Sequence, residues 1–285
     1  MDALPTLSTV STIADALRHA AVVGVDRLDA QMLLLATLGR APGDRAWLLA
    51  HDRDPVQAEW PMFAALLRRR AAGEPVAYLL GEKEFFGLPL QVDARVLVPR
   101  PDTETLVNWA LELLPDGRAA RVLDLGTGSG AIALAVSSNR PMASVDAVDA
   151  SEDALHVARA NAARLGLPVR FFAGDWFGGA PDGRYELVLS NPPYIAEGDR
   201  HLDALRHEPL SALTSGPDGL DDLRAIVAGA PARLCDGGWL LLEHGWDQAD
   251  AVRGLLSAAG LEEVQSRTDF GGNQRCSGGR LPLRG

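Results

Sequence analysis

One segment near the middle of the chain limits the possible folds more than any other. Residues 121–125 have the length and apolar character of a buried strand, and they lead directly into the loop Gly126-Thr127-Gly128-Ser129-Gly130. Glycines let the backbone turn tightly and approach a ligand without an intervening Cβ. Residues 131–137 have a helical pattern, and the free N–H groups of such a helix would face the same point. A strand, a glycine loop and a helix in this order predict an α/β fold with a ligand site at the loop.

The rest of the chain after residue 120 repeats this alternation. Such alternation is typical of a mostly parallel sheet that is covered by helices on both faces. Ligands of these sheets bind at the carboxyl ends of the strands, where the strand order reverses. Further strands are predicted at 144–149, 169–172, 186–190, 239–243 and 262–266, and helical patterns include 154–165 and 220–234.

The first third of the chain has a different pattern. Apolar residues recur at helical spacing from about residue 9 to 81, which predicts a small helical bundle. Residues 84–98 contain the turn signal Phe86-Gly87-Leu88-Pro89 between two short apolar stretches, which predicts a hairpin or linker. Asp102 or Thr103 can then cap the next helix. We therefore predict a helical bundle at 1–82, a hairpin linker at 83–99 and an α/β domain at 100–285.

The composition argues against several classes of protein. The formal net charge is −11 and Lys83 is the only lysine, whereas a protein that grips nucleic acid usually has a basic face. Cys235, Cys276 and the six histidines show no metal-ligand spacing. No apolar run reaches the ~18 residues that cross a bilayer, and the N-terminus does not resemble a secretory signal. We expect a cytoplasmic protein with no metal ion, no membrane contact and no direct contact with nucleic acid.

The glycine loop by itself leaves the ligand open. Gly126, Gly128 and Ala131 satisfy the dinucleotide pattern GxGxxG/A, but the same loop also suits S-adenosylmethionine. Asp149 ends the second predicted strand, 23 residues after Gly126, where a carboxylate can accept hydrogen bonds from both hydroxyls of a ribose. An acidic cap of the following helix is the alternative. Trp176 can border an adenine, or it can be a buried core residue.

The tetrad Asn191-Pro192-Pro193-Tyr194 favours one of these cofactors. It follows the predicted strand 186–190, at the same edge of the sheet as the glycine loop. An amide nitrogen is a poor nucleophile because its lone pair is delocalised, so an enzyme that methylates it should hold the NH2 protons with acceptors. The Asn191 side-chain oxygen and the rigidly held Pro192 carbonyl can accept them, and Tyr194 can cover the amide. A dehydrogenase has no use for such a tetrad, which favours S-adenosylmethionine.

With these motifs the chain resembles the peptide-chain release factor glutamine methyltransferases, the PrmC/HemK family of class I S-adenosylmethionine-dependent enzymes. The likeness extends over nearly the whole length, and His207 is a departure, since the family usually has Tyr there. Beyond the glycine loop and the tetrad, it is carried by Tyr78-Leu79-Leu80-Gly81, Glu84-Phe85-Phe86-Gly87, Pro99-Arg100-Pro101-Asp102-Thr103-Glu104, Asn161, Asp175-Trp176-Phe177, Glu208-Pro209, Glu243, Gly245, Gln248, Asp269 and Arg275.

The resemblance implies a Rossmann-like methyltransferase domain with a seven-stranded mixed sheet, a preceding helical bundle and a hairpin. It implies methylation of the glutamine side-chain nitrogen (N5) in the Gly-Gly-Gln motif of class I release factors, with the bundle docking the release factor. Arg100 and Thr103 would lie near the mouth of the site. The catalytic residues would be Asn191, Pro192 and Tyr194, the glutamine would be held by these with Pro193, and the cofactor would be bound by Gly126, Thr127, Gly128, Ser129, Gly130, Asp149, Trp176 and Asn191.

Three other functions remain open. A ribosomal-protein glutamine methyltransferase would carry the same tetrad, but the PRPDTE segment at 99–104 favours release factors. A DNA adenine N6-methyltransferase faces the same chemical problem, yet it must flip a base and hold phosphates, which the acidic composition does not favour. A cofactor-binding module without catalysis is the third, and the intact Asn191 and glycine loop argue against it.

Overall fold

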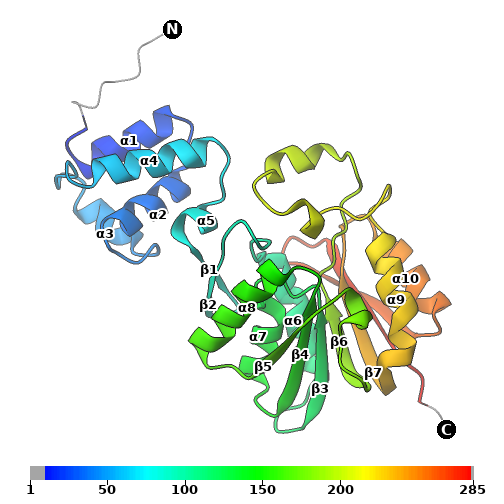
Figure 1. The fold of residues 1–285 in the computed structure, drawn as a ribbon. Coiled ribbons are helices and arrows are strands. Elements are labelled where there is room, and N and C mark those ends of the chain that lie inside the picture. The colour runs from blue at the N-terminus through cyan, green and yellow to red at the C-terminus, as the bar shows by residue number, and fades with distance from the viewer. Residues whose placement is uncertain (1–9, 284–285) are drawn as a thin grey trace. The chain divides into compact units, whose positions relative to one another are not determined.

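The computed structural model describes residues 10–283. Contacts divide the chain into two compact units, the first ending at Gly81 and the second beginning at Glu82. The first unit is helical (Figure 1), as its apolar spacing predicts. Its helices are α1 (Ile13–Val22), α2 (Arg27–Thr37), α3 (Arg45–Ala50), α4 (Trp60–Ala71) and α5 (Val76–Leu80). In the described part of the chain, no helix is long and apolar enough to cross a membrane.

The helical unit has its own apolar core. Thr12 caps α1 through a reciprocal pair of hydrogen bonds with Asp15, which satisfies donors that the helix start leaves free. Arg70 in α4 pairs with Asp29 in α2 at 2.6 Å and joins these two helices. The buried core includes Ile13, Leu33, Leu34, Leu35, Leu48, Phe63 and Leu67.

A two-stranded hairpin opens the second unit. Strand β1 (Glu82–Phe85) pairs with β2 (Leu88–Gln91) in antiparallel register. The turn residues Phe86 and Gly87 have φ of +51° and +77°, which is the backbone that a two-residue hairpin turn requires. Phe85 and Leu90 are buried in the core of the second unit, so contacts group the predicted linker with the α/β unit.

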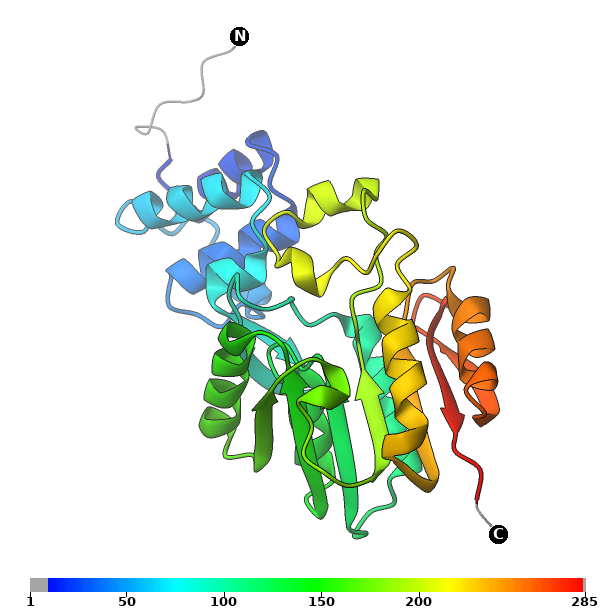
Figure 2. The same cartoon turned by 45° about the vertical axis from the view of Figure 1, so that its right-hand side comes forward.

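The second unit is built on a seven-stranded mixed sheet, and the predicted fold class is confirmed (Figures 1 and 2). The strand order is β5-β4-β3-β6-β7-β9-β8, so the order reverses between β3 and β6. β9 alone runs antiparallel to its two neighbours. The strands are β3 (Ala120–Leu125), β4 (Ala143–Asp149), β5 (Val169–Ala173), β6 (Tyr185–Ser190), β7 (Leu234–Glu243), β8 (Glu262–Thr268) and β9 (Gln274–Arg280).

Helices cover both faces of this sheet. One face packs against α6 (Glu104–Leu113) and α7 (Ala131–Asn139), and the other packs against α9 (Asp221–Arg233) and α10 (Ala249–Ala258). Helix α8 (Glu152–Leu165) contacts β4, β5 and the hairpin strand β2. Short 3-10 turns complete the unit at η1 (Pro101–Thr103), η2 (Trp176–Gly178), η3 (Arg200–Leu205) and η4 (Leu210–Ala212).

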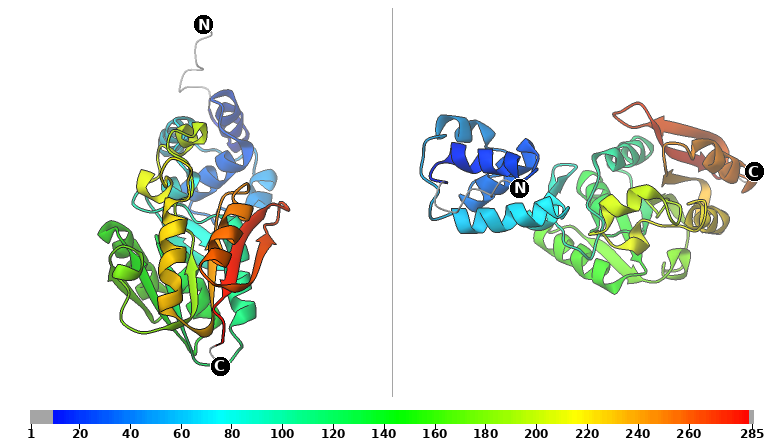
Figure 3. Two further views of the ribbon diagram at one scale, coloured as in Figure 1. Left: turned by 90° about the vertical axis from the view of Figure 1, so that its right-hand side faces the viewer. Right: turned by 90° about the horizontal axis from the view of Figure 1, so that it is seen from above.

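Two local expectations differ from the structure. Strand β9, which lies between β7 and β8 and is drawn in red in Figure 3, was not predicted from the residues, because Gly278 and Gly279 lack a strand's apolar pattern. A Cβ at Gly278 would lie 2.4 Å from the Leu241 side chain, so close packing against β7 requires glycine there. Asp102 or Thr103 was expected to cap α6; Thr103 occupies the N-cap position, but its side chain makes no cap hydrogen bond.

Candidate active site

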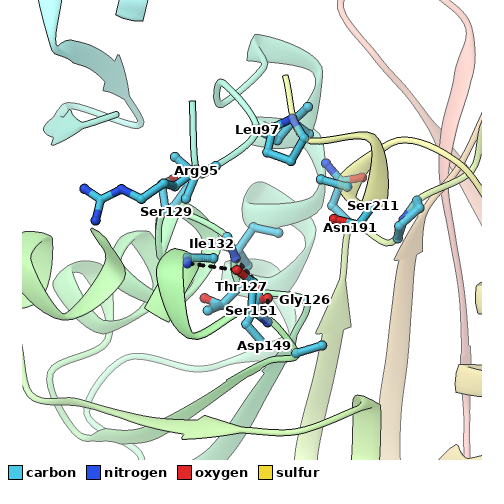
Figure 4. Close-up of a pocket in the computed structure, with 18 of the residues that line it drawn as sticks. Arg95, Leu97, Gly126, Thr127, Ser129, Ile132, Asp149, Ser151, Asn191 and Ser211 are labelled. Atoms are coloured by element: carbon cyan, nitrogen blue, oxygen red, sulfur yellow. Dashed lines mark hydrogen bonds between the residues drawn. The ribbon is translucent and has the colours of Figure 1, made fainter. Parts of the chain in front are cut away.

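A cavity of about 300 Å3 lies in the second unit at the carboxyl ends of β3, β4 and β6. This is the point where the strand order reverses, as expected for a ligand site in such a sheet. Figure 4 shows residues of the glycine loop, Asp149 and Asn191 around this one cavity. The predicted residues that line it are Gly126, Thr127, Gly128, Ser129, Asp149, Trp176, Asn191 and Pro193. Gly130, Pro192 and Tyr194 do not line it.

The glycine loop is held against the neighbouring strand. The backbone nitrogens of Gly126 and Thr127 both donate to the carbonyl of Val148 in β4, at 2.9 and 3.0 Å. Gly126 has φ of +71°, and a Cβ there would lie 3.2 Å from the Trp176 ring. Gly128 has φ of +56° and no atom within 4 Å of a Cβ position. The loop therefore presents bare backbone to the cavity.

Asp149 is hydrogen-bonded to the glycine loop and lines the cavity beside it. Its Oδ2 accepts from the Gly128 nitrogen at 2.8 Å, and its Oδ1 accepts from the Ser151 nitrogen at 2.9 Å. Ser151 is the residue that caps α8, through a bond from the Ala154 nitrogen to its hydroxyl. Burial raises the pKa of the Asp149 carboxyl group. Each carboxylate oxygen keeps further acceptor capacity for a ligand hydroxyl.

A second carboxyl group lies beneath the loop. Asp124 is fully buried in β3 and accepts a hydrogen bond from the Thr127 hydroxyl at 2.6 Å and another from the Ala133 nitrogen at 3.3 Å. Burial raises the pKa of Asp124 to about 7. No role was assigned to Asp124 from the sequence. An acidic residue in an apolar strand directly before a glycine loop is nevertheless a sequence pattern that indicates a residue supporting the loop.

Trp176 forms a wall of the cavity. It is half-buried, stands at the start of η2 with φ of +44°, and packs beside Gly126. Its ring is therefore available to the cavity on one side and rests on the core on the other. Trp176 is therefore not a fully buried core residue, and its contact with an adenine stays a prediction.

Both ends of the tetrad are held by hydrogen bonds to residues outside it. From the sequence, no role was assigned to Glu243 and Gln248, and Thr103 was placed only near the mouth of the site. Asn191 donates from Nδ2 to the Thr103 hydroxyl at 3.2 Å. The Tyr194 hydroxyl donates to Glu243 Oε1 at 3.4 Å, and the Tyr194 carbonyl accepts from Gln248 Nε2 at 3.0 Å. Burial raises the pKa of Tyr194. Pro192, between these anchors, is buried.

The segment before α6 also borders the cavity. Glu208 Oε2 accepts from the Val98 nitrogen at 3.0 Å, and the Glu208 carboxylate pairs with Arg100. This one acid therefore joins residues 98–100 to the loop that follows β6. Pro209 and Ser211 on that loop line the cavity together with Leu97 (Figure 4). Among the described residues, no group of three or more His, Cys, Asp or Glu side chains could hold a metal ion.

Comparisons with known proteins first define the class. The family described as the methyltransferase small domain matches residues 103–212, which include the glycine loop, Asp149 and the tetrad. The family described as the PrmC N-terminal domain matches residues 10–81. A solved structure of a methyltransferase from Pyrococcus furiosus has the same fold, with a TM-score of 0.55 at 19% identity, over 78% of this chain and 99% of that one. The second unit is thus a Rossmann-like methyltransferase domain.

Two relatives narrow this class to one family. A release factor glutamine methyltransferase of Bordetella pertussis is 55% identical, over 90% of this chain and 96% of the relative. One from Xylella fastidiosa (strain Temecula1) is 50% identical, over 94% of this chain and 98% of the relative. The chain belongs to the release factor glutamine methyltransferase family, and it is an enzyme of the methyltransferase class.

Proposed function

We propose that this protein transfers a methyl group from S-adenosylmethionine to the side-chain nitrogen N5 of the glutamine in the Gly-Gly-Gln motif of class I release factors. One observation carries the proposal: Asn191 lines the same cavity as the glycine loop and Asp149. A group able to hold an amide therefore lies beside a site suited to a nucleoside. The names of the relatives support the choice of release factors as the substrate.

The residues present fit S-adenosylmethionine. The open space at Gly128 leaves room for a ligand against the backbone, since no atom lies within 4 Å of a Cβ position there. The Asp149 oxygens would accept from the ribose hydroxyls, and the Trp176 ring would border the adenine. Gly126, Thr127 and Ser129 also line the cavity and would border the cofactor, whereas Gly130 does not line it and would act by shaping the turn. When bound, the cofactor supplies an electrophilic methyl group, and no metal ion is needed.

The protein's own contribution is to orient the glutamine amide. Asn191 Oδ1 and the Pro192 carbonyl would accept from the two amide protons, so that the nitrogen lone pair points at the methyl group. Orientation of this kind can contribute roughly 7–11 kcal/mol to lowering a barrier. Pro193 lines the cavity and would border the amide. Tyr194 does not line the cavity, and in this proposal it would cover the planar face of an amide held beside the cavity. The proposed catalytic residues are therefore Asn191, Pro192 and Tyr194.

The division of the chain has a place in the same proposal. The helical unit would dock the body of the release factor, while the α/β unit would receive its glutamine. The hairpin would serve as the linker between these tasks. Because release factors act in translation, we propose that the protein works in the cytoplasm, without direct contact with nucleic acid or membrane.

Transfer of a labelled methyl group tests the proposed substrate. In three separate reactions, the purified enzyme and labelled S-adenosylmethionine are incubated with a class I release factor, with a ribosomal protein preparation or with duplex DNA. We expect label only in the release factor, and none in a release factor whose motif glutamine is replaced by alanine. Label in ribosomal protein or DNA would instead support the corresponding rival function. Asn191→Ala should lower kcat by about 10²- to 10³-fold, as for other single transition-state donors or acceptors.

A further inference from the structure

A buried carboxyl group lies behind the tetrad. Glu243 ends β7 and is 1% exposed. Its Oε1 accepts from the Tyr194 hydroxyl, whereas its Oε2 is buried without a hydrogen-bond donor among the described residues. A buried and incompletely satisfied carboxylate is costly. Its position beside the tetrad therefore calls for a functional explanation.

Thr103 connects this carboxyl group to Asn191. The Thr103 side chain is buried, with its hydroxyl oxygen accepting from Asn191 Nδ2 at 3.2 Å. The same hydroxyl is among the groups that lower the pKa of the Glu243 carboxyl group, which itself accepts from the Tyr194 hydroxyl at 3.4 Å. A hydroxyl has one proton to donate. If the Thr103 proton goes to Glu243, the Thr103 hydroxyl can only accept a hydrogen bond from Asn191. The NH2 end of the Asn191 amide must then face Thr103, because only that end can donate.

The two ends of a carboxamide are nearly identical in shape, so packing alone does not choose between them. With Nδ2 at Thr103, Oδ1 is left for the cavity as an acceptor. In the flipped arrangement the NH2 group would face the cavity instead. Two NH2 groups would then meet at the proposed substrate, where neither could accept from the other.

We propose that Thr103 and Glu243 are positioning residues that hold the Asn191 carboxamide with its oxygen toward the substrate amide. Glu243 sets the direction of the Thr103 hydroxyl, and Thr103 in turn sets the orientation of Asn191. Through Tyr194 the same carboxylate also holds the other end of the tetrad. This inference rests on the proposed function, because it concerns the amide substrate of that reaction.

The test compares three variants with the wild-type protein. Thr103→Val keeps the shape of the side chain and removes the hydroxyl, while Thr103→Ser keeps the hydroxyl. Thr268→Val is the matched control, since Thr268 is exposed at the end of β8 in the second unit and does not line the cavity. For each protein we would measure kcat and KM for the release factor, the dissociation constant of S-adenosylhomocysteine, and the thermal midpoint.

We expect Thr103→Val to lower kcat about five- to tenfold, as for loss of one orienting hydrogen bond. Binding of S-adenosylhomocysteine should stay within about twofold of wild type, because the Asp149 and glycine-loop contacts are untouched. Thr103→Ser should restore most of kcat, and Thr268→Val should leave it unchanged. Should Thr103→Val fail to fold, Thr103→Ala gives the same comparison, since it also removes the hydroxyl.

The outcomes separate this inference from the proposed function. If wild type does not methylate the release factor, the proposed function fails and the inference fails with it. If wild type is active and Thr103→Val keeps full kcat, the positioning role is contradicted while the function stands. A loss that Thr103→Ser does not restore, or one that follows weakened cofactor binding, would also overturn the inference by indicating a merely structural role.

Discussion

Burial raises the pKa of Glu243 to about 7, from an ordinary value of 4.5. Thr103, Tyr194 and the nearby cation of Arg275 oppose this shift, whereas Asp102 adds to it. Cys276 also faces the carboxyl group, and the negative charge of Glu243 is among the causes that raise the thiol pKa. At the position of Glu243 behind the tetrad, the charged form of the carboxyl group is therefore destabilised relative to the neutral form.

This shift predicts how stability depends on pH. The folded protein binds the Glu243 proton more tightly than the unfolded chain, so this contribution is fully present below about pH 4.5 and is lost as pH rises to about 7. Glu243→Gln removes the dependence. The free energy of unfolding of this variant, relative to wild type, should rise by on the order of 2 kcal/mol between pH 4.5 and pH 8. Urea unfolding at both values measures it, and an identical difference at each pH would contradict the assignment.

Gly126 has a left-handed backbone conformation and also lines the cavity. Its φ of +71° disfavours any other residue, and a Cβ would also press on the Trp176 ring at 3.2 Å. Gly117 has nearly the same φ, +70°, with nothing within 4 Å, so it isolates the backbone effect.

Replacing each glycine with alanine should therefore separate strain from binding. Both variants should lose about 1 kcal/mol of stability, but only Gly126→Ala should weaken binding of S-adenosylhomocysteine, by about tenfold or more. Calorimetric titration compares the two. Equal binding by both variants would show that the loop does not contact the cofactor.

At the level of elements, the hairpin is joined to the glycine loop through Asn161 on α8. Asn161 is fully buried and exchanges two hydrogen bonds with the backbone of Gln91 in β2, at 2.7 and 3.0 Å. It also donates to the carbonyl of Ser129 at 3.0 Å. One side chain thus fixes β2 and the loop together.

Asn161→Ala should destabilise the protein by about 2–3 kcal/mol, because it leaves buried backbone groups without partners. Asn139→Ala is the control: its single bond goes to Ala135 in its own helix, and its effect should stay within about 0.5 kcal/mol. Chemical unfolding of both variants provides the comparison. A loss as small as that of the control would show that Asn161 does not join the hairpin to the loop.

The elements also show what sequence reasoning can and cannot reach. The strand, glycine loop and helix around Gly126 were predictable because local glycine chemistry and apolar spacing determine them. Strand β9 was not, since its glycines are required by contact with β7 and not by a local pattern. Asp102 or Thr103 was expected to cap a helix, whereas the Thr103 hydroxyl bonds to Asn191, which is 88 residues away. Sequence spacing carries no information on such long-range pairs.

At the scale of the whole molecule, all the described residues that line the cavity belong to the second unit. The first unit matches a different family model, that of the PrmC N-terminal domain. Cofactor binding should therefore not require the helical unit, whereas the proposed docking of the release factor should.

A chain that begins at Glu82 tests this division. Provided that circular dichroism shows cooperative unfolding, it should bind S-adenosylhomocysteine within about twofold of the full chain, while kcat/KM for the release factor falls about tenfold or more. Unchanged kcat/KM would contradict a docking role for residues before Glu82.

The central claim is that Asn191 and Pro192 orient a glutamine amide toward a methyl donor in the adjoining cavity. Tandem mass spectrometry of a release factor treated with enzyme and S-adenosylmethionine tests this most directly. The account predicts a gain of about 14 Da, the mass of one CH2, confined to the glutamine of the Gly-Gly-Gln peptide and absent with Asn191→Ala. A methyl group on any other residue, or the same gain with Asn191→Ala, would contradict it.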